Sequence, residues 1–495
     1  MQHGHRETRR RSLNWQMLLK VTGWLLMIEA AFMLVPMGTC LAYGEEDWLI
    51  FAISAAVTAV CGFAMRSIRA TGGHMGRREG FLLTASVWVW FSLFGMIPFI
   101  FCNQGFSVPD AFFAAMSGFT TTGASLSGSH AHLSYGINIW HAMMQWIGGM
   151  GIILFTLAVI PMLNSAGGMQ MFNAEVTGIT HDKVRPRISS TAKALWGTYF
   201  ALTILLFFAL WLGPMDIYDS TVYALTCIST GGFVGTSHGL AYFGSDYVYG
   251  VITLFMFAGG VNFTLIFRSL TGGVKSFWRN EVFRVYVLVI LLMFVLIDLQ
   301  ILHDPDGPLT WQSLTIYPLF HVVSIITSTG YESGCFVWWT PLVIGLTIIM
   351  MFTGACAGST TGGAKLDRIV FMAKYLRNEI YRCVRPNAVL SVRIDGRVRS
   401  PEIVGKVVAF LCLYVIIIFT GGLVLMAMDM PLLDALFSAF SCMSNTGLGA
   451  DVTGYGSNFS ILPDAGKWLL SALMLIGRLE IFTVLIIFTV PFWRK

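Results

Sequence analysis

Four short polar segments interrupt a strongly apolar chain, and each one ends in a Thr-Gly pair. They read DAFFAAMSGFTTTG, YDSTVYALTCISTG, YPLFHVVSIITSTG and LLDALFSAFSCMSNTG, at residues 110–123, 218–231, 317–330 and 432–447. Glycine lets a loop expose its carbonyl groups, and such carbonyls can replace the hydration shell of a cation. One Thr-Gly pair is weak evidence because turns are rich in these residues. Four at equivalent places indicate a shared cation site.

Alignment on the Thr-Gly pair selects three candidate cation ligands from each segment. They are Thr121, Thr122 and Gly123; Ser229, Thr230 and Gly231; Ser328, Thr329 and Gly330; and Asn445, Thr446 and Gly447. Asp110, Asp219 and Asp434 stand near the start of three segments, where an aspartate suits a helix N-cap. Each short helix would then point its negative C-terminal end at the site.

The elements that position these segments are membrane helices. The chain has 495 residues, of which 56% are hydrophobic and only 12% charged, against about 25% charged in soluble domains. Apolar runs predict ten spanning helices, near 21–42, 47–65, 84–103, 139–161, 194–213, 247–268, 284–302, 339–360, 402–428 and 465–491. The polar segments lie between helices three and four, five and six, seven and eight, and nine and ten.

This order predicts an all-α polytopic membrane protein with two N-terminal helices and then four repeated units. Each unit consists of a helix, a short re-entrant helix, a polar loop and a second helix. Non-helical backbone at membrane depth survives only where protein buries it or it lines water, so the four loops should converge with pseudo-fourfold symmetry. The predicted divisions are 1–80 for the extension and 81–185, 186–275, 276–395 and 396–495 for the units.

Charge placement predicts the orientation. With the N-terminus inside, 29 of the 31 lysines and arginines fall in inner segments, and both termini are cytoplasmic. The two exceptions, Lys467 and Arg478, lie in the last helix. Lys467 stands near its outer end, where its charge can reach the interface.

A small, polar stretch, TGACAGSTTGGAK at 353–365, interrupts the helix after the third segment. It is not a phosphate loop, because Ala364 separates its glycines from Lys365 and no strand precedes it. It is either a kinked helix end or a flexible loop below the candidate site. In the second case the candidate gate residues are Gly354, Ala355, Gly358, Ser359, Thr360, Thr361, Gly362 and Gly363.

Arg478 is an ionisable residue within an apolar helix, which is costly and favours a functional role. Glu480 is two residues away and would not share its helix face. The alternative is a structural ion pair with another helix.

At these residues the sequence resembles the Trk/Ktr/HKT superfamily of potassium transporters, and most closely its TrkH-type ion-conducting subunits. The resemblance covers essentially the whole chain and implies four linked membrane–pore–membrane units like those of a potassium channel. It implies that potassium is the transported ion, that no organic cofactor is needed, and that Gly123 favours potassium, because plant relatives with serine there prefer sodium. It also implies an intramembrane gating loop and a cavity-facing arginine.

The resemblance further implies a homodimer in a bacterial inner membrane, above a ring of cytoplasmic nucleotide-binding regulatory subunits of the TrkA type. Nucleic acid is not an expected partner.

Three alternatives remain at this point. In the first, the small residues only allow close helix packing in some other transporter. A sodium- or proton-coupled symporter predicts inverted repeats and buried mid-membrane carboxylates, whereas these repeats are parallel and such acids are nearly absent. A membrane enzyme predicts a His/Asp/Glu or Cys/His constellation, and the nine cysteines are scattered singly.

Overall fold

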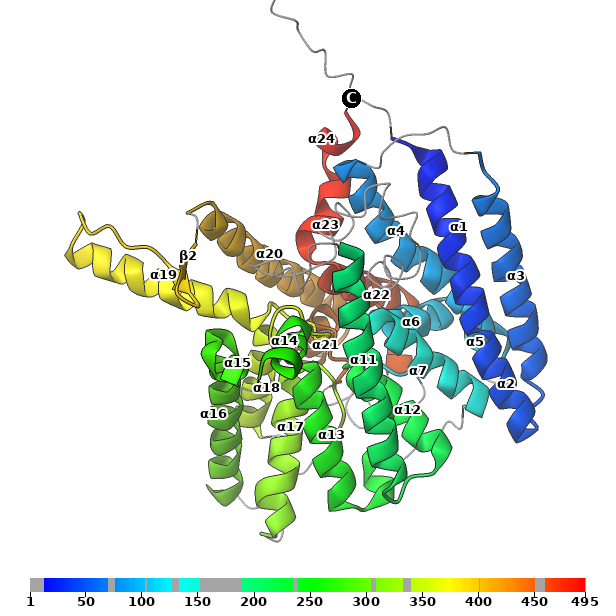
Figure 1. The fold of residues 1–495 in the computed structure, drawn as a ribbon, viewed down its shortest axis with the longest axis horizontal. Coiled ribbons are helices and arrows are strands. Elements are labelled where there is room, and N and C mark those ends of the chain that lie inside the picture. The colour runs from blue at the N-terminus through cyan, green and yellow to red at the C-terminus, as the bar shows by residue number, and fades with distance from the viewer. Residues whose placement is uncertain are drawn as a thin grey trace, which may run out of the picture.

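Apolar stretches of bilayer length form the long helices of this chain, and short polar breaks separate them (Figure 1). The computed structural model describes residues 13–69, 76–102, 105–126, 133–151, 188–234, 239–273, 275–303, 309–332, 340–399, 401–449 and 459–494. Across these residues the fold is helical, and its only strands form the hairpin of β1 (Arg393–Ile394) and β2 (Arg397–Val398). The predicted all-α membrane class is confirmed.

The chain begins with α1 (Trp15–Phe32), α2 (Leu34–Tyr43) and α3 (Trp48–Arg66), and four successive groups of helices follow, which we call units. The first unit contains α4 (Arg77–Gly95), α5 (Ile97–Phe101), α6 (Val108–Phe119) and α7 (Tyr135–Gly149). The second contains α11 (Ile188–Trp211), α12 (Ile217–Ile228), η1 (Gly239–Phe243), α13 (Asp246–Gly259), α14 (Phe263–Gly272) and α15 (Lys275–Arg279).

The third unit contains α16 (Glu281–His303), η2 (Gln312–Ile316), α17 (Tyr317–Ile326), α18 (Pro341–Thr353) and α19 (Leu366–Val384), followed by the β1–β2 hairpin. The fourth contains α20 (Pro401–Met426), α21 (Leu432–Ser444), η5 (Phe459–Ile461), α22 (Asp464–Arg478), α23 (Ile481–Leu485), η6 (Ile486–Phe488) and α24 (Val490–Trp493). Each unit thus has a long leading helix (α4, α11, α16 or α20), a short helix (α6, α12, α17 or α21) and a trailing helix (α7, α13, α18 or α22).

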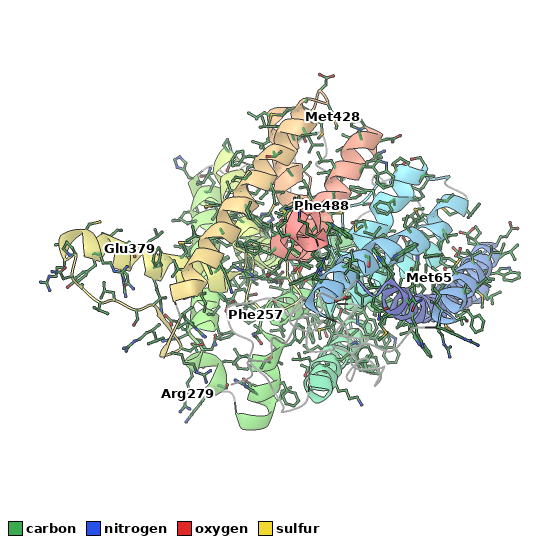
Figure 2. The ribbon with its side chains drawn as sticks, turned by 90° about the horizontal axis from the view of Figure 1, so that it is seen from above. Met65, Phe257, Arg279, Glu379, Met428 and Phe488 are labelled. Atoms are coloured by element: carbon green, nitrogen blue, oxygen red, sulfur yellow. The ribbon has the colours of Figure 1, made fainter. Side chains whose placement is uncertain are left out.

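The four units close into a ring. The trailing helix of each unit packs against the short helix of the next: α7 on α12, α13 on α17, α18 on α21 and, closing the circle, α22 on α6. Figure 2 shows helices from distant parts of the chain gathered around the C-terminal segment that carries Phe488. The cyclic order of these contacts is the arrangement that four parallel repeats predict.

Within the described residues, six helical runs are long and apolar enough to cross a membrane. They are Trp15–Tyr43, Trp48–Arg66, Arg78–Phe101, Ala192–Trp211, Glu281–His303 and Ile403–Met426. Each matches one of the ten predicted spans. The other four predictions concern the trailing helices, which end or break in the structure.

The trailing helices of the second and fourth units are bent, by 101° between α13 and α14 and by 114° between α22 and α23. The predictions of continuous spans at 247–268 and 465–491 are therefore wrong. Asn262 starts a new helix by accepting the backbone N–H groups of Thr264 and Leu265, and Glu480 has a left-handed φ of 59° that ends α22.

The trailing helix of the third unit, α18, stops at Thr353, where the sequence predicted the interruption. In the first unit α7 ends at Gly149, and the rest of the predicted span over 139–161 lies outside the described residues from 152 onward.

The N-terminal helices pack on the first unit: α1 lies along α3 and contacts α4, and α2 contacts α7. Where α1 crosses α3, a β-carbon on Gly23 would lie 2.5 Å from the backbone nitrogen of Arg66, so only glycine permits this close approach. Figure 1 shows α1–α3 on one flank of the molecule and α19 with its hairpin projecting from the other.

Candidate cation site and the loop beside it

The four short helices end in the same unusual turn. Where each short helix ends, one residue that is not glycine has a left-handed backbone, with φ of 56° at Thr121, 53° at Thr230, 49° at Ser328 and 54° at Asn445. Two residues further on the backbone is left-handed again, with φ of 76° at Gly123, 68° at Gly232, 78° at Gly330 and 76° at Gly447. Side chains cost roughly 1–2 kcal/mol in this conformation, and its fourfold recurrence indicates one shared loop geometry.

This geometry corrects the alignment of the second segment. Gly232, not Gly231, has the conformation of Gly123, Gly330 and Gly447, and Gly231 takes the position of Thr122, Thr329 and Thr446. The sequence alignment chose Gly231 because it follows a threonine directly, but the turn starts at the left-handed residue. Gly232 therefore takes the position in the turn that the alignment on Thr-Gly gave to Gly231.

The four left-handed glycines form a closed ring with the neighbouring units. A β-carbon on Gly123 would lie 1.9 Å from the carbonyl oxygen of Gly231, and one on Gly232 would lie 1.6 Å from that of Thr329. A β-carbon on Gly330 would lie 1.9 Å from the oxygen of Thr446, and one on Gly447 would lie 2.0 Å from that of Thr122. The glycine of each loop therefore lies against a backbone carbonyl of the next unit, from the first unit to the second, third and fourth and back to the first.

The predicted ligand residues are all brought together by this ring. Their polar side chains are buried, and three of the loops carry a hydroxyl pair: Thr120 with Thr122 at 2.8 Å, Thr327 with Thr329 at 2.7 Å, and Ser444 with Thr446 at 2.8 Å. The C-terminal ends of the short helices meet here, and their partial negative charge favours a cation. The arrangement offers four carbonyls, from Thr122, Gly231, Thr329 and Thr446.

The sequence suggested that the aspartates at the N-terminal ends of the short helices are N-caps, and this prediction is wrong. The capping positions are occupied by Ser107, Asp216 and Pro431, and Asp110, Asp219 and Asp434 lie in the first turn instead. A carboxylate there still complements the positive end of the helix, so the helix polarity is as expected.

Residues 354–365 form a loop that is attached to the left-handed turns. The backbone N–H of Gly362 donates to the Ser328 hydroxyl at 2.6 Å, and the hydroxyls of Thr230 and Thr360 lie 3.2 Å apart. A β-carbon on Gly362 would lie 1.9 Å from the carbonyl oxygen of Ser444. The loop thus contacts the second, third and fourth units directly beside the carbonyl ring.

The remaining loop residues fix its own shape. Gly354, Gly358 and Gly363 have φ of 60°, 78° and 77°, and the Ser359 hydroxyl donates to the Cys356 carbonyl at 2.6 Å and lies 2.8 Å from that of Thr361. The carbonyl of Ala355 accepts from the N–H of Leu366 at 2.9 Å. The predicted loop residues therefore form one folded segment rather than a kinked helix end.

Arg478, the last residue of α22, joins this loop to the first unit. Its guanidinium donates to the carbonyl of Thr360 at 2.6 Å and to those of Gly148 and Gly149 at 2.6 and 2.9 Å. Glu480 instead accepts two hydrogen bonds from Arg368, at 2.6 and 2.7 Å. The two neighbours in sequence therefore have different partners, as their spacing predicted.

Lys467 has a partner that the sequence did not reveal. It is buried, and its Nζ lies 2.6 Å from Oδ1 of Asp110, so the pair ties α22 of the fourth unit to α6 of the first. The sequence predicted only that this charge reaches the interface, and the structure adds a partner, Asp110, from another unit.

Lys467→Met is expected to destabilise the protein by about 1–3 kcal/mol. Breaking a buried ion pair costs about 3–5 kcal/mol, and we discount this because the Asp110 side chain is 22% exposed. Thermal unfolding in detergent measures the change, and adding Asp110→Asn should recover part of it. Equal unfolding temperatures for the wild type and both variants would contradict a stabilising pair.

A ring of four helix–loop units within a bundle of membrane-length helices defines a polytopic membrane protein. The family model that matches residues 49–493 is TrkH, described as a cation transport protein. The chain belongs to the TrkH family of cation transport proteins, which confirms the predicted resemblance and the prediction of a transporter rather than an enzyme.

Relatives and a solved structure agree with this membership. The chain is 33% identical over 492 residues to the Trk system potassium uptake protein TrkH of Salmonella typhimurium, covering 98% of this chain and 100% of that protein. It is 34% identical over 486 residues to the Trk system potassium uptake protein TrkI of Halomonas elongata, covering 97% of each. The crystal structure of the potassium transporter TrkH from Vibrio parahaemolyticus superposes with a TM-score of 0.87, at 31% identity, over 97% of this chain and 100% of that one.

Proposed function

We propose that the chain takes up potassium ions through a channel-like pore whose narrowest part is the carbonyl ring. The observation that carries this proposal is the closed cycle in which each left-handed glycine abuts the next unit's carbonyl. Carbonyl oxygens held in a ring replace the water around a dehydrating cation, and the four helix C-termini add favourable partial charge. The relatives named as potassium uptake proteins support potassium as the ion.

The loop at 354–365 is the proposed gate. It contacts the turns at Thr230 and Ser328, and Arg478 connects it to the first unit. A positive charge beside the ion path opposes cations, so an open pore requires the loop and Arg478 to move.

The proposed organisation is an extension over 1–80 and pore units over 81–185, 186–275, 276–395 and 396–495. We propose that the chain lies in a bacterial inner membrane with both termini on the cytoplasmic side. Trp15 stacks on Trp493 with ring centroids 6.4 Å apart, so the two ends of the chain are on one side, and the segments on that side contain most of the basic residues. A homodimer above a TrkA-type nucleotide-binding ring follows from the family resemblance, and the basic arm formed by α19 and the hairpin is its proposed docking surface (Figure 2, near Glu379).

A sodium- or proton-coupled symporter is less favoured than passive conduction. The units repeat in parallel around one ring, whereas symporter sites typically lie between inverted repeats.

Growth of a potassium-uptake-deficient bacterial strain on low potassium tests the proposal. The chain should restore growth and mediate rubidium uptake. Absence of rescue with the protein present in the membrane and its regulatory subunits co-expressed would overturn it.

Gly123→Ser is expected to lower the potassium-to-sodium flux ratio, by roughly ten-fold if it withdraws one ring carbonyl worth about 1.4 kcal/mol. A serine β-carbon would collide with the Gly231 carbonyl and displace it from the ring. Paired isotope uptake measurements on membrane-matched samples give the ratio. An unchanged ratio would remove Gly123 from the filter.

A further inference from the structure

One position in the trailing helices differs between the units. Three residues before Gly148, Gly259, Thr353 and Gly477 stand Gln145, Met256, Met350 and Met474, and all four are buried. The local sequences QWIG, MFAG, MMFT and MLIG show the shared register. The first unit alone has a polar side chain here.

The second unit, which follows the unit with Gln145 around the ring, also differs from the others: it has Gly231 where they have threonine. The trailing helix with Gln145 packs on the short helix that leads to Gly231, whereas those with Met256, Met350 and Met474 pack on the helices that lead to Thr329, Thr446 and Thr122. We call each contact between a trailing helix and the short helix of the next unit a junction. Three junctions therefore combine methionine with threonine, and one combines glutamine with glycine.

The contacts explain this exchange. The Gln145 side-chain N–H donates to the Gly231 carbonyl at 3.0 Å, and its Oε1 accepts from the Phe233 N–H at 3.4 Å. Gly231 does not have a left-handed backbone, so its conformation would accept a side chain. A β-carbon there would lie 2.4 Å from Gln145 Oε1, so Gly231 lacks a side chain because Gln145 fills that space.

We propose that Gln145 is a positioning residue that sets the ion selectivity of the ring by holding the Gly231 carbonyl. Among the hydrogen bonds of the described residues, Gly231 is the one ring carbonyl of the four that accepts from a side chain. A carbonyl has two lone pairs, so the amide occupies one, fixes the direction of the carbonyl and leaves the other lone pair for an ion. This inference rests on the proposed potassium pore.

The test compares Gln145→Met, Gly231→Thr and the double variant, which gives the first junction the pair found at the other three. Gln145→Met keeps the volume but removes the donor, and Gly231→Thr displaces the amide. Each single change should lower the potassium-to-sodium flux ratio by roughly 3- to 10-fold, the effect of one hydrogen bond. The double variant should return to within about two-fold of the wild type, because the two positions interact.

Gln145→Asn, one methylene shorter, provides a second variant that keeps polarity and withdraws the amide, and it should give the same loss. Gln312→Met is the matched control, since Gln312 bonds Asp246 away from the ring, at 3.0 Å. Wild-type ratios in the Gln145 variants, or a double variant whose loss is the product of the two single losses, would overturn the inference. Failure of the wild type to take up potassium would instead overturn the proposed function.

Discussion

Gly232→Ala is expected to reduce potassium uptake strongly, whereas Gly231→Ala, one residue earlier, should reduce it much less. Gly232 has a φ of 68°, and its β-carbon would lie 1.6 Å from the Thr329 carbonyl oxygen. The conformation costs roughly 1–2 kcal/mol for a side chain, and a collision with backbone cannot be relieved by a rotamer change. At Gly231 the obstacle is the flexible end of Gln145, which can move aside.

Rubidium uptake at equal membrane abundance separates the two variants. We expect a loss of more than about ten-fold for Gly232→Ala, because more than 1.4 kcal/mol is involved, and a flux within roughly three-fold of wild type for Gly231→Ala. The reverse order would restore the original alignment on Thr-Gly and refute the ring derived from the backbone.

Two kinds of feature could be predicted from the sequence: long apolar runs and segments that recur along the chain. Apolar length predicted six of the spans, and the recurrence of the polar segments predicted four units in cyclic contact. The loop at 354–365 and Arg478 were found because glycine-rich and charged residues are costly inside a membrane helix.

Features that depend on a partner from another unit could not be predicted from the sequence. The sequence does not show which of Gly231 and Gly232 contacts Thr329, because this depends on the left-handed backbone turn at Thr230. The sequence shows only that Lys467 lies near the outer end of a helix. Its ion pair with Asp110 depends on the packing of α22 on α6. The bend at Asn262 depends on a side-chain cap that forms only when the chain has already turned.

Arg478→Ala is expected to raise the basal cation flux, measured without regulatory subunits, by roughly ten-fold or more. Arg478 is the donor that joins Thr360 of the loop to Gly148 and Gly149 of the first unit, and a charge-assisted hydrogen bond contributes about 1.5–3 kcal/mol. Losing about 3 kcal/mol from a closed state changes a two-state equilibrium by roughly 100-fold. The same change removes a positive charge from beside the proposed ion path, so both effects act in one direction.

Arg478→Lys distinguishes these two effects, because lysine keeps the charge but lacks the planar set of donors that reaches three carbonyls. If the bridge holds the gate closed, the lysine variant should also leak, with a basal flux closer to that of the alanine variant than to the wild type. If the charge alone opposes cations, the lysine variant should stay as closed as the wild type. Arg382→Ala, which removes an exposed arginine paired with Glu379 on α19, serves as the control and should leave basal flux unchanged. Low basal flux in both Arg478 variants would show that neither the bridge nor the charge keeps the pore closed, and the loop would then need another anchor, such as the hydrogen bond between Gly362 and Ser328.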